Sequence, residues 1–161
     1  VPVLCWLHQP FPYEYYTHSV PVTASFPYQD FLTWFWLIKY PYQNIPVAIA
    51  TATNRKLLES ALLRLGISDL IQKIFTCSEC KTTKTVPDIY LACCNFFNTK
   101  PEETVVFEDT LVAITTVANA NFICVGIKDK SSSHDAEKIM QKTNYYMEDF
   151  NQFFDLDFVN K

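Results

Sequence analysis

The chain has 161 residues and a formal net charge of −4, and 49% of its residues are hydrophobic. This length suits a single domain with a sizeable core, and the acidic balance argues against a nucleic-acid partner. No apolar run reaches the roughly 18 residues of a membrane span, and the N-terminus lacks the basic start of a signal peptide, so the sequence predicts a cytoplasmic protein without a membrane partner.

Helical and strand-like patterns alternate along the chain from residue 29 onward. Apolar runs predict strands at residues 47–50, 71–77, 104–107, 121–127 and 145–147. Helical spacing predicts helices at residues 29–39, 55–65, 87–97, 110–119 and 133–142, followed by a closing turn or helix at 148–154. Gly66 is the expected stop signal of the second helix. The alternation predicts an α/β fold: a parallel sheet with helices on both faces and a site at the carboxyl ends of its strands.

The chain has six cysteines and only two glycines. Cys77 and Cys80 have the spacing of a C-x-x-C motif, but no second pair completes a metal site, so the sequence predicts buried or partly buried free thiols. Because turns commonly need a residue with positive φ, some of the places that glycine usually takes are expected at Asn44, Asn54 and Asn121.

A candidate phosphate site begins at residues 47–53, an apolar run that ends in hydroxyl residues and precedes a helix. Thr51 is expected at the carboxyl end of a buried strand, where its hydroxyl and the following backbone N–H groups can point at an anion near a helix N-terminus. An ordinary strand cap is the alternative, because threonine is common in strands and turns.

Two later positions supply what a phosphate would need. Lys84 lies in a loop that enters a helix, where a lysine is usually only solvated, but its loop follows the strand after Thr51. Its ammonium group can therefore offset phosphate charge at the same edge of the sheet. Glu108 and Asp109 directly follow an apolar strand, where adjacent carboxylates are costly unless a cation or hydrogen bonds compensate them. A helix N-cap explains only one of them, whereas Mg²⁺ bound with phosphate and water explains both.

These residues, in this order, resemble the haloacid dehalogenase (HAD) superfamily, in its β-phosphoglucomutase-like and phosphoglycolate-phosphatase-like branch. The resemblance covers residues 26–154. It rests on the segments 47–53 (VAIATAT), 84–91 (KTVPDIYL), 105–110 (VVFEDT) and 147–150 (MEDF). It implies a three-layer Rossmann-like core at residues 26–161 and phosphoryl transfer through an aspartyl-phosphate.

The resemblance also implies a role for each candidate site residue. Thr51 and the backbone N–H of Ala52 bind the transferred phosphoryl group, and Lys84 neutralises the charge of the phosphate and the nucleophile. Asp109 binds Mg²⁺, and Glu108 supports the metal.

The first motif is where the chain departs from the family. Members begin with an apolar strand that ends in Asp-x-Asp, whose first Asp attacks phosphorus and whose second acts as acid and base. Trp6 and His8 stand at the matching positions of this chain. Trp6 has no nucleophilic atom, whereas His8 could transfer protons. The cap domain is nearly missing as well, so residues 1–25 are expected to form a strand-like segment and a cap remnant (13–20) of one overall domain.

Three explanations compete for the missing aspartates. The chain is a pseudoenzyme that kept the fold, its N-terminal sequence is incomplete or unreliable, or residues 1–12 do not form the first-motif strand. The second explanation is favoured, because a lineage freed from catalysis has little chemical reason to keep Thr51, Lys84 and the acidic pair together.

The leading hypothesis is a Mg²⁺-dependent phosphatase or phosphomutase for a small phosphorylated metabolite, inactive as the chain is written because the nucleophilic Asp is absent. The alternative is a non-catalytic binding or scaffold domain, whose aromatic N-terminal segment covers a partner or a second copy of the chain in a homodimer. Core packing would explain these aromatic residues equally well: Trp6, Phe11, Tyr13, Tyr15 and Tyr16. The substrate stays open, because the cap selects it in this family.

Overall fold

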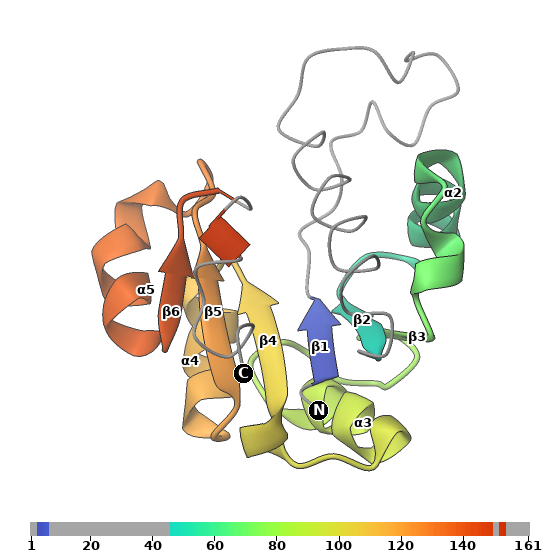
Figure 1. Ribbon diagram of the computed structural model, residues 1–161, viewed down its shortest axis with the longest axis horizontal. Coiled ribbons are helices and arrows are strands. Elements are labelled where there is room, and N and C mark those ends of the chain that lie inside the picture. The colour runs from blue at the N-terminus through green and yellow to red at the C-terminus, as the bar shows by residue number, and fades with distance from the viewer. Residues whose placement is uncertain (1–2, 7–45, 150–151, 154–161) are drawn as a thin grey trace.

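A single parallel sheet organises the part of the chain that the computed structural model describes, residues 3–6, 46–149 and 152–153 (Figure 1). Within these residues, six strands pair in the order β3-β2-β1-β4-β5-β6. The strands are β1 Val3–Trp6, β2 Val47–Thr51, β3 Lys73–Thr76, β4 Thr104–Glu108, β5 Ile123–Ile127 and β6 Tyr145–Met147. The predicted parallel α/β fold is therefore confirmed.

Several sequence-based predictions fall outside the described residues. These are the helix at 29–39, the cap remnant at 13–20, the boundary near residue 25, the positive φ at Asn44, and His8, together with part of the closing segment 148–154.

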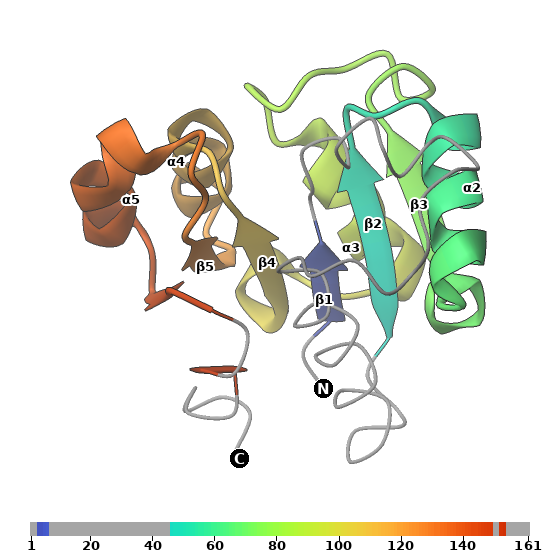
Figure 2. The same ribbon diagram turned by 90° about the horizontal axis from the view of Figure 1, so that it is seen from above.

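Helices cover both faces of the sheet. They are α2 Arg55–Leu65, α3 Asp88–Phe97, α4 Leu111–Asn119 and α5 Ala136–Lys142, with short 3-10 turns at η2 Ser68–Leu70, η3 Pro101–Glu103 and η4 Ser133–Asp135. Helix α3 lies against β1, β2 and β3 (Figure 2), and α4 lies against β4 and β5 and packs on α5. Connections between parallel strands are right-handed, so α2, which leads outward to β3, and α3, which leads back to β4, lie on opposite faces.

The core follows the same division into two faces. Helices α3, α4 and α5 share one buried cluster with alternate strand residues: Ala48, Ala50, Val106 and Cys124. Helix α2 buries a set of apolar side chains outside that cluster: Leu58, Ala61 and Leu62. Successive strand residues point to opposite faces of the sheet. Each strand can therefore contribute side chains to the core on either face, as expected for a sheet with helices on both faces.

Local signals fix both ends of α2. The side chain of Asn54 caps the N-terminus and accepts a hydrogen bond from the backbone N of Lys56 at 3.0 Å. Gly66 ends the helix in the left-handed conformation, with φ 68°, as its sequence position predicts. The expected positive φ at Asn54 is wrong, since its φ is −61° and it serves as N-cap instead. Asn121 does take a positive φ of 63°, and Asn98 does so as well at 54°.

Two strands are shorter than predicted, because neighbouring turns use their first residues. Ile71 donates its backbone N–H to Ser68 and closes η2, so β3 begins only at Lys73. Phe122 donates its backbone N–H to Val117 and closes the end of α4, so β5 begins at Ile123. The helix predicted at 133–142 likewise begins as the 3-10 turn η4.

The first-motif segment occupies the middle of the sheet. Strand β1 pairs with β2 on one side and with β4 on the other, and Trp6 lies level with Ile49 and Phe107. Residues 3–6 thus form a strand within the sheet, between β2 and β4. The three explanations for the missing aspartates stay predictions.

The cysteines from Cys77 to Cys124 are free thiols. Cys93, Cys94 and Cys124 are buried, and Cys77 and Cys80 are half-buried. Cys93 and Cys94 both join the core cluster, because α3 is deeply packed against the sheet. None of the helices in the described ranges is long and apolar enough to cross a membrane.

Candidate active site

Thr51 lies at the carboxyl end of β2 and is buried, with 1% of its surface exposed. Its Oγ1 accepts a hydrogen bond from the backbone N of Thr53 at 3.0 Å. Its carbonyl oxygen accepts one from the backbone N of Cys77 at 2.8 Å, which continues the pairing of β2 with β3 by one residue. The turn from Thr51 to the helix cap at Asn54 is therefore held from both ends, while Ala52 in its middle is exposed.

Lys84 reaches from the loop after β3 to the end of β4. Its Nζ lies 3.0 Å from Oε1 of Glu108, and this ion pair is largely buried, since the Lys84 side chain is 15% exposed and that of Glu108 is 0% exposed. The structure thus brings together two of the residues that the sequence singled out, although Lys84 lies in the loop after β3 and Glu108 ends β4.

Glu108 accepts two further hydrogen bonds inside the protein. The hydroxyl of Tyr90 on α3 donates to its Oε1 at 3.3 Å, and the backbone N of Asp109 donates to its Oε2 at 3.1 Å. Burial nevertheless raises the pKa of Glu108 to about 7, because the Lys84 ammonium only partly offsets the loss of water and the neighbouring Asp109 adds to the rise. Glu108 is therefore a buried carboxyl whose charge depends on its surroundings near neutral pH.

Asp109 differs from Glu108 in having an unpaired oxygen. The residue is 7% exposed, and its Oδ1 has no hydrogen-bond partner among the described residues. Burial raises its pKa, the Lys84 ammonium opposes that rise, and Asp129 beyond the end of β5 adds to it. A buried carboxylate oxygen without a partner is costly, and a bound cation would compensate it. The carboxylate thus fits the Mg²⁺ that the family resemblance implies.

The described residues contain no cluster of three or more His, Cys, Asp or Glu side chains with the geometry to hold a metal. Any cation here would therefore depend on Asp109 and Glu108, with further oxygen ligands from water, a phosphate or other parts of the chain.

Sheet register places the remaining candidates around β1. Thr51 is two residues beyond Ile49, and Asp109 is two residues beyond Phe107, which are the two partners of Trp6. Strands β2 and β4 flank β1, and all strands run parallel. Thr51 at the end of β2 and Asp109 just after β4 therefore lie on opposite sides of β1, at the carboxyl-terminal edge of the sheet. Whether these residues bind phosphate stays a prediction.

The sequence analysis did not identify two residues that interact with the acidic pair, Tyr90 and Asp129. Tyr90 lies within a helix and shows no local sign of its contact with Glu108. Asp129 follows the carboxyl end of β5, and that placement is the same signal that marked Glu108 and Asp109, so it could have been found.

Comparisons with known proteins find a matching family model and similar sequences. A family model described as haloacid dehalogenase-like hydrolase matches residues 38–121. A validoxylamine A 7'-phosphate phosphatase from Streptomyces hygroscopicus subsp. limoneus is 31% identical over 98 residues, which are 61% of this chain and 45% of that protein. A fructose-1-phosphate phosphatase from Escherichia coli is 26% identical over 92 residues, which are 57% of this chain and 49% of that protein. The chain thus spans less than half the length of these curated relatives.

Solved structures show the same fold. A β-phosphoglucomutase from Clostridium difficile superposes with a TM-score of 0.61 at 25% identity. The match covers 76% of this chain and 50% of the mutase. A HAD family hydrolase from Deinococcus radiodurans, solved with bound phosphate and sodium, superposes with a TM-score of 0.66 at 18% identity. The match covers 78% of this chain and 56% of that protein.

Proposed function

Because the chain belongs to the haloacid dehalogenase-like hydrolases, we propose that it binds the phosphate group of a small phosphorylated metabolite together with Mg²⁺, as a phosphatase or phosphomutase does. The observation that carries the proposal is the buried Lys84–Glu108 ion pair beside the unpaired carboxylate oxygen of Asp109. Two relatives named as phosphatases of phosphorylated small molecules support this substrate class.

Each residue of the site has a task in this proposal. The Thr51 hydroxyl and the Ala52 backbone N–H donate to phosphate oxygens, and the Lys84 ammonium offsets their charge. Asp109 holds the Mg²⁺, and Glu108 keeps Lys84 in place through its ion pair. When bound, Mg²⁺ supplies Lewis-acid stabilisation of the phosphate charge.

The residues at the first motif limit the chemistry that this sequence supports. Trp6 lies at the end of β1, level with Phe107 one residue before Glu108, and the family resemblance matches it to the nucleophilic aspartate. An indole ring has no group that can attack phosphorus, so we expect binding of the phosphate without a covalent intermediate. This observation also favours a second candidate function, a non-catalytic binding or scaffold domain.

Ligand binding is tested by thermal unfolding with Mg²⁺ and inorganic phosphate. A Kd of about 1 mM would give about 1.4 kcal/mol of stabilisation at about 10 mM Mg²⁺, which raises the Tm by a few degrees. Asp109→Asn should abolish the response to Mg²⁺, and Lys84→Ala should weaken the response to phosphate. Asp69→Asn is the matched control, since Asp69 is exposed before the start of β3, at the opposite edge of the sheet. If Mg²⁺ raised the Tm of Asp109→Asn and of Asp69→Asn equally, the proposed metal site at Asp109 would be refuted.

Catalysis is tested separately with small phosphomonoesters. The chain as given should show no Mg²⁺-dependent hydrolysis above background, whereas Trp6→Asp combined with His8→Asp should gain activity by restoring a nucleophile and an acid-base group. Hydrolysis by the unchanged chain that disappears in Lys84→Ala would show that the protein is an enzyme with a different nucleophile. A folded double variant that binds phosphate but stays inactive would favour the non-catalytic candidate.

A further inference from the structure

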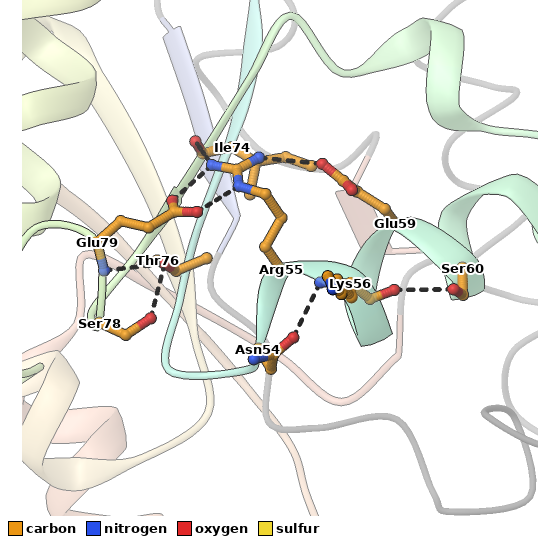
Figure 3. Close-up of polar contacts among 9 residues, drawn as sticks. All are labelled: Asn54, Arg55, Lys56, Glu59, Ser60, Ile74, Thr76, Ser78 and Glu79. Carbon is orange, nitrogen blue, oxygen red and sulfur yellow. Dashed lines mark hydrogen bonds and ion pairs between the residues drawn. The ribbon is translucent and has the colours of Figure 1, made fainter.

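Arg55 at the start of α2 and Glu79 in the turn after β3 form an ion pair (Figure 3). The guanidinium Nε lies 2.5 Å from Glu79 Oε1 and the Nη2 lies 2.6 Å from Glu79 Oε2, so the pair is bidentate. The same Nη2 donates to the carbonyl oxygen of Ile74 on β3 at 2.9 Å, and Nη1 donates to Glu59, one turn along α2, at 3.2 Å. A fork of this kind fixes direction as well as distance.

Arg55 belongs to the segment that carries Thr51. It is the first residue of α2 and follows the N-cap Asn54, only four residues after Thr51. A shift of Arg55 therefore moves the short turn from Thr51 to Asn54.

Glu79 belongs to the segment that leads to Lys84. Its backbone N donates to Thr76 Oγ1 at 3.2 Å, and Thr76 Oγ1 lies 3.1 Å from Ser78 Oγ. The turn is closed by the backbone bonds Cys80 N to Thr76 O at 3.0 Å and Thr82 N to Cys77 O at 2.9 Å. Glu79 is thus fixed in a closed turn that ends two residues before Lys84.

The ion pair is placed to affect geometry more than stability. Arg55 and Glu79 have side chains that are 34% and 46% exposed, and exposed ion pairs contribute little to stability. The hydrogen bond from Arg55 holds the pKa of Glu79 down at about 2, so the carboxylate stays charged at neutral pH. Among the contacts of the described residues, the two segments are also joined by the backbone bond from Cys77 N to Thr51 O and by the pairing of Thr51 with Thr76 between β2 and β3.

We propose that the Arg55–Glu79 ion pair is a positioning device of the candidate phosphate site, which sets the Lys84 loop at a fixed place relative to the Thr51 turn. The proposal rests on the proposed function, because it assigns these two residues to the same site. Neither residue touches the phosphate in this account. They act through Lys84 and Thr51.

The informative variant is Glu79→Gln, with Glu59→Gln as the matched control. Both changes remove one carboxylate partner of Arg55, but Glu59 lies on the same helix as Arg55 and joins no second loop. Affinity for inorganic phosphate is measured by calorimetry in the presence of Mg²⁺. We expect Glu79→Gln to weaken the phosphate affinity about fivefold, which is at the upper end of what an exposed ion pair contributes, and Glu59→Gln to leave the affinity unchanged.

A double-mutant cycle with Lys84→Ala separates positioning from a general loss of structure. If the ion pair acts by placing Lys84, Glu79→Gln should add little to the loss that Lys84→Ala causes alone. A full additional fivefold loss in the Lys84→Ala background would overturn the part of the proposal that concerns Lys84.

Amide hydrogen exchange tests the link between the loops without any ligand. In Glu79→Gln, the amides of Cys77, Cys80 and Thr82 should exchange about fivefold faster than in the unchanged chain, and in Glu59→Gln they should not. Unchanged exchange in Glu79→Gln would refute the positioning role. Absence of phosphate binding by the unchanged chain would instead refute the proposed function, and the exchange data would still decide whether the pair holds the two loops.

Discussion

Glu108→Gln tests how a buried carboxyl makes the stability of this protein depend on pH. Burial raises the pKa of Glu108 from an ordinary value of 4.5 to about 7, so between these values the folded protein holds a proton that the unfolded chain has released. Stability must therefore fall as the pH rises through this window, and the loss is complete about one unit above the folded pKa. Glutamine does not ionise, so the variant lacks this loss.

The magnitude follows from the pKa. One pKa unit corresponds to about 1.4 kcal/mol, so the rise from 4.5 to about 7 corresponds to about 3 kcal/mol of unfolding free energy. No reduction for solvent screening is needed, because Glu108 is only 1% exposed. The pKa of Asp109 is raised as well, chiefly by burial, and adds a fall of the same sign in both proteins, although its size differs because a hydrogen bond with Glu108 lowers this pKa in the unchanged chain. The difference between the two pH profiles therefore reports mainly on Glu108.

The assay is urea unfolding at pH 5, 6, 7 and 8 in a buffer with a chelator. Relative to pH 5, the unchanged chain should lose about 2.5 kcal/mol more than Glu108→Gln by pH 8, because part of the loss already occurs below pH 5. Glu59→Gln is the control, because Glu59 is an exposed carboxylate on α2. Its unfolding free energy should change with pH as that of the unchanged chain does. Parallel profiles for Glu108→Gln and the unchanged chain would refute the reasoning that a buried carboxyl controls this dependence.

Two further substitutions give expected outcomes that are simpler to measure. Gly66→Ala should lower the unfolding free energy by about 1 kcal/mol, because its φ of 68° strains any L side chain although no atom lies within 4 Å of an added Cβ; urea unfolding checks this. Thr51→Val should cost about 1 kcal/mol, since the backbone N of Thr53 loses the Oγ1 acceptor, and should also weaken phosphate binding in the calorimetric assay.

The sequence predicted most of the fold because the relevant signals are local. Helix α2 has its predicted bounds, since Asn54 caps its start and Gly66 permits its end. The carboxyl-end positions of Thr51 and Glu108 follow from the apolar runs before them, and a parallel sheet places all such ends at one edge. Predictions failed where one residue had two local options, as at Asn54, which serves as a cap instead of taking a positive φ.

Tertiary structure alone decided how these residues meet. The ion pair of Lys84 with Glu108, the Tyr90 hydroxyl on the same carboxylate and the link from Arg55 to Glu79 join residues 24, 18 and 24 positions apart in the sequence. The raised pKa of Glu108 is likewise a result of burial, which depends on packing that no short motif specifies. Secondary structure follows from nearby side chains, whereas charge and contact at the site arise only when distant loops exclude water from the same few carboxylates.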